Sequence, residues 1–486
     1  MPRFFSKLET RIFYLLIFAI PFETRLIVAR WTKPFNEWTA SYLYGTDILI
    51  VALLILWFFR SYRHRKSIDL STSQVDRFWR LSNPTMWLAG FFIVSALSIF
   101  LPADASHQAM QAGNARIIGL SLYQLLKLAE FIGFYFYLRA SFGKIYKFRE
   151  VLMVIIASGI FQAAIAIAQY FKQGSLVLKL FGESPLSVNA SGVAVFIADG
   201  VKYLRAYGTA PHPNVLAAWL FLAIFAFYNY YYYFYPHTKR GLVGSRAEGA
   251  DPRYGVGVYP RGQSSLGKLL LANYPVLLVG LFFTFSRTII GLWALGAAIR
   301  VSLLFKKSFR GFLIATKQYT ITIVAITLVT GILFTAFFWP QVKSRVLVSM
   351  DEEAVTQRIF YNKIAGSVTA ANPILGVGIG QSVPQLMIKM KHWPANIYQP
   401  VHNIYLLIAS ETGLAGLSLF LLFLIFVFYG FIKRTKLHKA YQCSFLILSL
   451  SFLVMGLFDH FLWTLQQGSL IFWTILALIS LNPDLG

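Results

Sequence analysis

Charged residues are scarce in this sequence, at 13% of 486 residues, and acids are scarcer than bases, with 19 Asp and Glu against 44 Lys and Arg. Soluble domains contain about 25% charged and about 45–50% apolar residues. Hydrophobic residues make up 57% of this chain. Because a soluble fold cannot bury that much apolar surface, the composition excludes an ordinary soluble enzyme and indicates a protein that lies in a bilayer.

Cysteine is nearly absent, since Cys443 is the only one. The chain therefore has no intrachain disulfide, and we expect neither a Cys-based zinc site nor an iron–sulfur cluster. The three histidines of interest, His212, His402 and His460, occur singly and without metal-ligand spacing such as H-E-x-x-H. We therefore expect no metal and no other cofactor. No G-x-S-x-G motif is present either.

Long apolar segments are abundant, and a transmembrane helix needs about 20 mostly apolar residues. The sequence predicts an all-α integral membrane protein with roughly 12 transmembrane helices in a single polytopic domain, residues 1–486. Pro21, Glu23 and Arg25 interrupt the first segment, which we expect to be short or bent. The predicted spans are residues 12–28, 44–59, 84–101, 118–138, 151–171, 215–235, 269–285, 288–305, 321–339, 404–431, 444–458 and 465–481.

The net charge of +25 comes from basic residues whose positions alternate with these spans. With the N-terminus inside, 28 of the 44 basic residues fall in inner loops, including the Gly-, Arg- and Ser-rich loop 236–268. This is the positive-inside pattern, and it predicts that both termini are cytoplasmic. The basic loops therefore need no nucleic acid to explain them. A long outer segment, residues 340–402, separates the ninth and tenth spans and is predicted to be partly helical.

Two outer motifs contain an arginine that orientation does not explain. In R-A-Y-G-T-A-P-H-P-N, residues 205–214, the Pro and Asn fit a turn and a helix start, which leaves Arg205 and, less clearly, His212 as candidates. In F-S-R-T, residues 285–288, a tight turn puts Arg287 at the outer boundary. Arg287 either extends to lipid headgroups or binds an anion, and we favour the anion because a guanidinium grips phosphate with a fork of donors.

The long outer segment and the span ends add further polar candidates. Residues 351–362 are predicted to form a helix that carries Arg358, and the glycine run 376–380 is predicted to be a flexible loop near a ligand. His402 and Asn403 lie where the segment reaches a span. Glu411 falls on the helix face opposite to His402 and is expected to bond a neighbouring span. Asp459 and His460 offer a second carboxylate–imidazole pair.

In this order, the motifs resemble the O-antigen ligase / O-antigen polymerase family, and the resemblance covers residues 205–468. The first five spans match only in general character. The matching elements are R-A-Y-G-T-x-x-H-P-N, S-R-T, Arg358 followed by N-P-I-L-G-V-G, H-N-I-Y-L-L-x-x-x-E-T-G-L-A-G, and F-D-H-F-L-W-T-L-Q-Q-G.

The resemblance implies an inverting membrane glycosyltransferase of the bacterial cytoplasmic (inner) membrane, with an extracytoplasmic active site. A glycan would move en bloc from undecaprenyl diphosphate to an acceptor hydroxyl, as in lipopolysaccharide and other cell-envelope polysaccharide biosynthesis. The resemblance assigns binding of the donor diphosphate to Arg287 and Arg358, with Arg205 as a further contact. It assigns the role of catalytic base to His402. His212, Asn214, Asn403, Glu411, Asp459 and His460 are secondary candidates.

The acceptor stays open between a glycan, a lipid such as lipid A-core, and a protein. The alternatives are a polysaccharide polymerase of the same family, a protein O-oligosaccharyltransferase, a flippase for lipid-linked oligosaccharides, and a purely structural protein. A flippase would need charged residues along a path at mid-membrane depth, where few besides Lys127, Glu130 and Glu411 occur. Membrane lipids are expected partners, and nucleic acid is not.

Overall fold

The computed structural model describes residues 3–65, 83–100, 115–233, 263–304, 310–346, 353–390, 392–394, 397–433 and 439–481. The described chain is mostly helical, and a helix occurs at each of the twelve predicted span positions. These helices are α1 (Arg3–Ala19), α2 (Gly45–Arg65), α4 (Pro84–Phe100), α6 (Ala115–Ser141), α7 (Phe148–Lys172), α8 (Pro213–Tyr233), α9 (Gln263–Phe283), α10 (Arg287–Leu304), α11 (Arg310–Phe337), α15 (Ile404–Ile432), α16 (Lys439–Phe458) and α18 (Gln466–Ser480).

Six of these helices are long and apolar enough to cross a membrane: α2, α7, α8, α9, α11 and α15. Three shorter apolar helices lie in α4, α16 and α18. The protein is therefore a helical membrane protein, and the count of twelve spans stays a prediction. The predicted basic loop 236–268 lies outside the described residues up to residue 262.

Two short β-hairpins accompany the helices of this mostly helical fold. β1 (Arg25–Arg30) pairs antiparallel with β2 (Ala40–Tyr44), and β3 (Val195–Ala198) pairs with β4 (Val201–Leu204). The first span, predicted within residues 12–28 and expected to be short or bent, is short, because α1 ends at Ala19, just before Pro21. Proline lacks the amide hydrogen that helix continuation needs, so the chain turns and enters β1 instead.

The core is formed around α8 and α18, which are almost completely enclosed by other helices. All of α18 is buried, and 94% of the apolar window of α8 is buried, including Trp219. α8 packs against α7 and α9, and α18 packs against α6 and α15. A helix that is apolar all round is expected at the centre of a membrane bundle.

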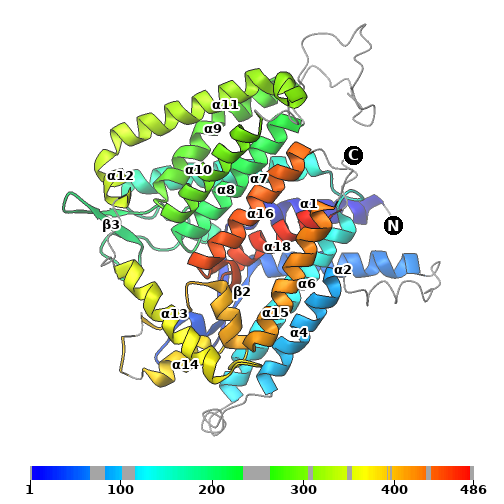
Figure 1. The fold of residues 1–486 in the computed structure, drawn as a ribbon, viewed down its shortest axis with the longest axis vertical. Coiled ribbons are helices and arrows are strands. Elements are labelled where there is room, and N and C mark those ends of the chain that lie inside the picture. Colours follow the sequence, from blue (N-terminus) through cyan, green and yellow to red (C-terminus); the bar gives the residue numbers. More distant parts are fainter. Residues whose placement is uncertain are drawn as a thin grey trace.

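The long predicted outer segment contains α12 (Trp339–Val346), α13 (Glu353–Ala371) and α14 (Ser382–Lys389), so it is partly helical as predicted. The start of α1 and the end of α18 lie on one side of the molecule, and α12, α13, α14 and β3 lie on the opposite side (Figure 1). α13 packs against α15. This arrangement brings the segment next to the ends of the central helices.

The helix α15 is broken at Gly413, which has φ 69° and ψ −178°. The two amides after the break donate hydrogen bonds to the segment that follows α13. Leu414 N–H donates to the Pro373 carbonyl at 2.7 Å, and Ala415 N–H donates to the Ile374 carbonyl at 3.3 Å. The single continuous helix predicted at 404–431 is therefore two helical pieces, joined at a turn that another part of the chain satisfies.

The glycine run 376–380 packs against this break and is not a free loop. Val377 and Gly378 donate backbone hydrogen bonds of 3.0 and 2.9 Å to the carbonyls of Ser410 and Glu411. Glu411 itself accepts a 2.7 Å bond from the Ser382 hydroxyl at the start of α14. The prediction of a flexible loop was wrong, and so was the prediction that Glu411 bonds a neighbouring span.

Candidate functional site

The site begins at a turn between α9 and α10 that another part of the chain holds in place. Phe285 in this turn has φ 47°, a left-handed conformation that bulky residues rarely adopt. The Nε of buried Arg205 donates 2.7 Å to the Thr284 carbonyl, and Ala206 N–H donates 3.0 Å to the Phe283 carbonyl. These bonds position Arg287, the first residue of α10.

Asn214, in the first turn of α8, joins this turn to the end of α16. Its Oδ1 accepts bonds from the Arg205 guanidinium at 2.7 Å and from the Ser286 hydroxyl at 2.9 Å. Its Nδ2 donates 2.6 Å to the carboxylate of Asp459, which follows α16. Asn214 therefore links segments that are far apart in the sequence.

Two histidines and two aromatic rings stand beside Asp459. The rings of His402 and His460 are 4.8 Å apart between centroids, at 77°. Tyr361 of α13 stacks on His402 at 6.0 Å, and Trp38 meets the face of His460 edge-on at 4.9 Å. The Nδ1 of His460 is 2.7 Å from the hydroxyl of Thr464 on α17 (Phe461–Thr464).

The pKa of Asp459 is lowered to about 2. Burial raises it, but the nearby His460, His402 and His212 and the hydrogen bond from Asn214 lower it further. The carboxylate is therefore ionised at neutral pH. It is a fixed negative charge beside the histidines.

In the three histidines, the effect of burial on the pKa outweighs the effect of the nearby Asp459 charge. Burial lowers the pKa of His402 below its ordinary value of 6.5, and Asp459 partly opposes this shift. Burial also lowers the pKa of His460 and of His212 to about 3. At neutral pH all three imidazoles are uncharged, so each can accept a proton. Asp459 would stabilise the cation that forms.

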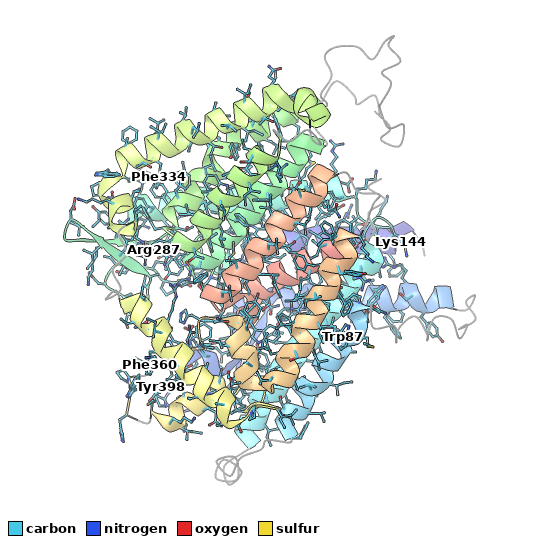
Figure 2. All side chains as sticks on the ribbon, viewed as in Figure 1. Trp87, Lys144, Arg287, Phe334, Phe360 and Tyr398 are labelled. Atoms are coloured by element: carbon cyan, nitrogen blue, oxygen red, sulfur yellow. The ribbon has the colours of Figure 1, made fainter. Side chains whose placement is uncertain are left out.

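Arginines gather on the other side of Asp459. Arg358 lines a small cavity together with Asn214, Ser286 and Asp459. In Figure 2, Arg287 lies between Phe334 on α11 and Phe360 on α13. The pKa of Arg205 is lowered to about 9, first by burial and then by the positive charge of Arg345, with Arg287 adding to it. Several guanidinium groups that repel one another favour an anion between them.

Arg345, on α12, is a member of this group that the sequence analysis missed. Its guanidinium also lies over the ring of Phe196 in β3, at 5.9 Å from the ring centroid. An available sequence signal was its position in the outer segment, where a basic residue runs against the positive-inside pattern. Ser286 and Trp38 were missed as well, because nothing local distinguishes them.

The secondary candidates divide into two groups. Asp459, His460 and Asn214 lie within the site. Asn403 caps α15, since its side chain accepts from the amides of Tyr405 and Leu406 at 2.9 and 3.1 Å. The Nδ1 of His212 accepts 3.1 Å from the Asn214 amide in the first turn of α8. These caps fix the directions from which His402 and Asn214 approach the site.

Among the described residues, no group of three His, Cys, Asp or Glu side chains is arranged to hold a metal ion. The guanidinium groups of the site can bind an anion, and its imidazoles can accept a proton.

The fold and the site together define a helical membrane protein with a basic anion pocket and a histidine cluster on the side away from its chain ends. A family model described as O-antigen ligase matches residues 274–421. The match includes Arg287, Arg345, Arg358 and His402, and it confirms the predicted resemblance over this part of the chain. No curated protein matches the chain.

Proposed function

We propose that this protein transfers a glycan en bloc from undecaprenyl diphosphate to an acceptor hydroxyl, with inversion at the anomeric carbon, on the extracytoplasmic face of the bacterial inner membrane. The observation that carries the proposal is the cavity that places Arg358 beside Asn214 and Asp459, because the charge of Asp459 also acts on His402 and His460. The match to the O-antigen ligase family supports the same class of membrane glycosyltransferase.

The arginines bind the donor diphosphate. Arg358 and Arg287 act directly, and Arg205 and Arg345 add positive charge behind them. As the bond between the anomeric carbon and the phosphate oxygen breaks, negative charge grows on the leaving diphosphate. Guanidinium groups already fixed in place stabilise that charge without reorganising and without the need for a metal.

His402 is the base for the acceptor. The acceptor oxygen forms a bond to the anomeric carbon while the bond from that carbon to the diphosphate oxygen breaks, and the diphosphate leaves with the electron pair. The hydroxyl proton passes to the neutral imidazole of His402. Asp459, ionised nearby, stabilises the imidazolium. Attack opposite to the leaving group inverts the configuration.

A membrane setting suits both substrates. The polyprenyl tail of the donor stays in the bilayer while its diphosphate and glycan reach the site at the helix ends. The basic inner loops fit a site on the opposite, extracytoplasmic side. Neither a nucleic acid nor a soluble cofactor is needed for this step.

The test is transfer from a lipid-linked donor in proteoliposomes. Arg358→Ala is expected to lower transfer on the order of a hundredfold, the size seen when one charge-stabilising group is removed from an active site. His402→Ala is expected to lower it at least as much. Lys363→Ala is the matched control, because Lys363 is exposed on the same helix. Undiminished transfer by Arg358→Ala and His402→Ala, with protein levels equal, would falsify the proposal.

The product distinguishes the related reactions. A single glycan joined to a lipid acceptor identifies a ligase, and a ladder of lengths without added acceptor identifies a polymerase. Label recovered on protein identifies an oligosaccharyltransferase. Movement of the donor across the liposome without consumption would support the flippase alternative instead.

A further inference from the structure

A second, larger cleft lies beside His460, since two of its lining residues contact that histidine. It has about 970 Å³ of empty space, part of it open to the exterior. Its walls come from the β1–β2 hairpin, α6, the segment 379–383 with Pro400 and Glu411, and the segment around α17. They include the aromatic residues Trp38, Tyr42, Tyr123 and Trp463. None of these four aromatic residues lies within the 274–421 family match.

The cleft adjoins the proposed base through a thin wall. Trp38 and Thr464 line the cleft, and the same two residues contact His460, one by its ring and the other by a 2.7 Å hydrogen bond. His460 in turn lies 4.8 Å from His402, measured between ring centroids. A ligand in the cleft therefore contacts the residues that touch His460, and only Trp38 and Thr464 separate it from the histidines.

Each cation in the cleft wall has carboxylate partners. Arg25 pairs with Glu23 at 2.8 Å and lies 3.8 Å from Glu37. Lys127 pairs with Asp47 at 2.6 Å and with Glu130 at 3.0 Å. Cations neutralised in this way do not attract a phosphate, in contrast to the arginine pocket. The ligand that fits is uncharged.

The other wall groups suit a sugar. The rings of Trp38 and Trp463 offer π-faces whose negative charge attracts the C–H bonds of a sugar ring. Gln124, Gln466 and the Ser382 hydroxyl offer hydrogen bonds to sugar hydroxyls. A cleft of aromatic faces and a few polar groups matches a small-molecule site.

The cleft walls are held in place by bonds between distant segments. The hydroxyl of Tyr123 accepts 3.1 Å from the Tyr42 amide and donates 2.9 Å to the Tyr42 carbonyl, which fixes α6 to the hairpin. Asn36 donates 2.9 Å from its side chain to the Tyr398 carbonyl, which fixes the hairpin to the segment before His402. The site is therefore preformed, which lowers the entropy lost on binding.

We propose that this cleft binds an uncharged sugar ring of the acceptor, with Trp38 and Trp463 as its platforms, and so determines acceptor specificity. The inference rests on the proposed transfer reaction, because it assigns the second substrate of that reaction. Donor and acceptor then bind in separate places near the histidines, with the diphosphate held by the arginines.

The test uses the full-length protein in detergent-free nanodiscs and measures binding directly by titration calorimetry. The probes are an octyl glycoside of a neutral disaccharide and the same compound carrying a phosphate. We expect the neutral glycoside to bind, and the phosphorylated one to bind at least tenfold more weakly. Trp38→Ala and Gln124→Ala are expected to weaken binding of the neutral glycoside at least tenfold. Phe35→Ala is the matched control, since Phe35 is exposed on the same hairpin outside the cleft.

Transfer from a lipid-linked donor is measured on the same variants. In Gln124→Ala the KM for the acceptor should rise at least tenfold while the KM for the donor is unchanged. Equal glycoside affinity in all four proteins, or tighter binding of the phosphorylated probe, overturns the cleft assignment even if transfer occurs. Glycoside binding that depends on Trp38 and Gln124 without any transfer by the native protein overturns the proposed reaction and leaves the sugar site standing.

Discussion

Asn214 donates a 2.6 Å hydrogen bond to the Asp459 carboxylate, joining residues 245 positions apart in the chain. The oxygen of the same side-chain amide accepts hydrogen bonds from Arg205 and Ser286, so Asn214 bonds to three separate segments of the site. The relationship connects the arginine turn to the histidine cluster, so disturbing it should affect both.

Asn214→Ala is expected to lower transfer at least tenfold. Leaving buried partners unsatisfied costs about 1–3 kcal/mol, which corresponds to roughly a tenfold to hundredfold change. Thermal unfolding in nanodiscs checks that the fold persists. Asn189→Ala is the control, because Asn189 is exposed on an outer loop. Equal transfer by the Asn214 variant and the native protein would show that these hydrogen bonds of Asn214 are not needed for transfer.

Arg345→Ala is expected to raise the KM for the lipid-linked donor by roughly tenfold, because it removes a positive charge behind the arginines that hold the diphosphate, and charges a few Å apart interact by about 1–4 kcal/mol. The kinetics of Lys343→Ala, two residues earlier and exposed on the same helix, should stay native. Steady-state assays with varied donor separate KM from kcat. The role assigned to Arg345 is wrong if both variants behave alike.

Transfer activity should persist as the pH falls through 6.5 and decline only at lower pH. His402 must be neutral to accept a proton, and burial lowers its pKa below 6.5. Asp459 opposes this shift, so Asp459→Asn should move the acid limb further down. The pH dependence of kcat/KM for the acceptor tests both statements, and an acid limb at or above 6.5 contradicts them.

Stability must be followed in the same pH range. The pKa of His212 and of His460 is lowered to about 3 in the folded protein, whereas an unfolded histidine titrates near 6.5. The unfolded state therefore binds protons first, and folded stability falls as the pH drops below 6.5 toward 3. Thermal unfolding at each pH separates this loss from protonation of His402.

Gly413→Ala is expected to destabilise the protein severely, while Gly430→Ala on the same helix is tolerated. Gly413 has φ 69°, and a Cβ there would lie 2.0 Å from the Ile374 carbonyl oxygen. The combination of φ 69° and ψ −178° is adopted essentially by glycine alone and costs another residue about 1–3 kcal/mol before any clash. Gly430 has open space around it. Folded yield after purification and the unfolding temperature report the difference, and equal values for both variants contradict the account.

Hydropathy predicted where the long helices of this fold lie, because an apolar helix depends on local composition. Pro21 ended α1 early, since one residue without an amide outweighs an apolar run. The hairpin at 25–44 was missed because its pairing depends on neighbours far along the chain. The break at Gly413 was missed for the same reason, because nothing in the local sequence distinguishes a glycine at a helix break from a glycine inside a continuous apolar helix.

The sequence also predicted individual site residues better than their connections. Arg358 and Asp459 were candidates for separate reasons, and the structure brings them to one cavity. Asn214 was predicted as a helix cap, and its bond to Asp459 needed the packing of α8 against α16. Trp38 carries no local polar signal, so only the structure places it beside His460.

The aromatic cleft and the arginine pocket come from different stretches of the chain. Trp38, Tyr42 and Tyr123 lie in the first 123 residues, about a quarter of the sequence, and Arg287 and Arg358 lie beyond the middle. Mutations in the first quarter can therefore alter what one side of the site accepts without touching the groups on the other side. Genes that descend from a common ancestor can diversify one substrate while inheriting the other, and the amino-terminal hairpin is where we expect that divergence to accumulate.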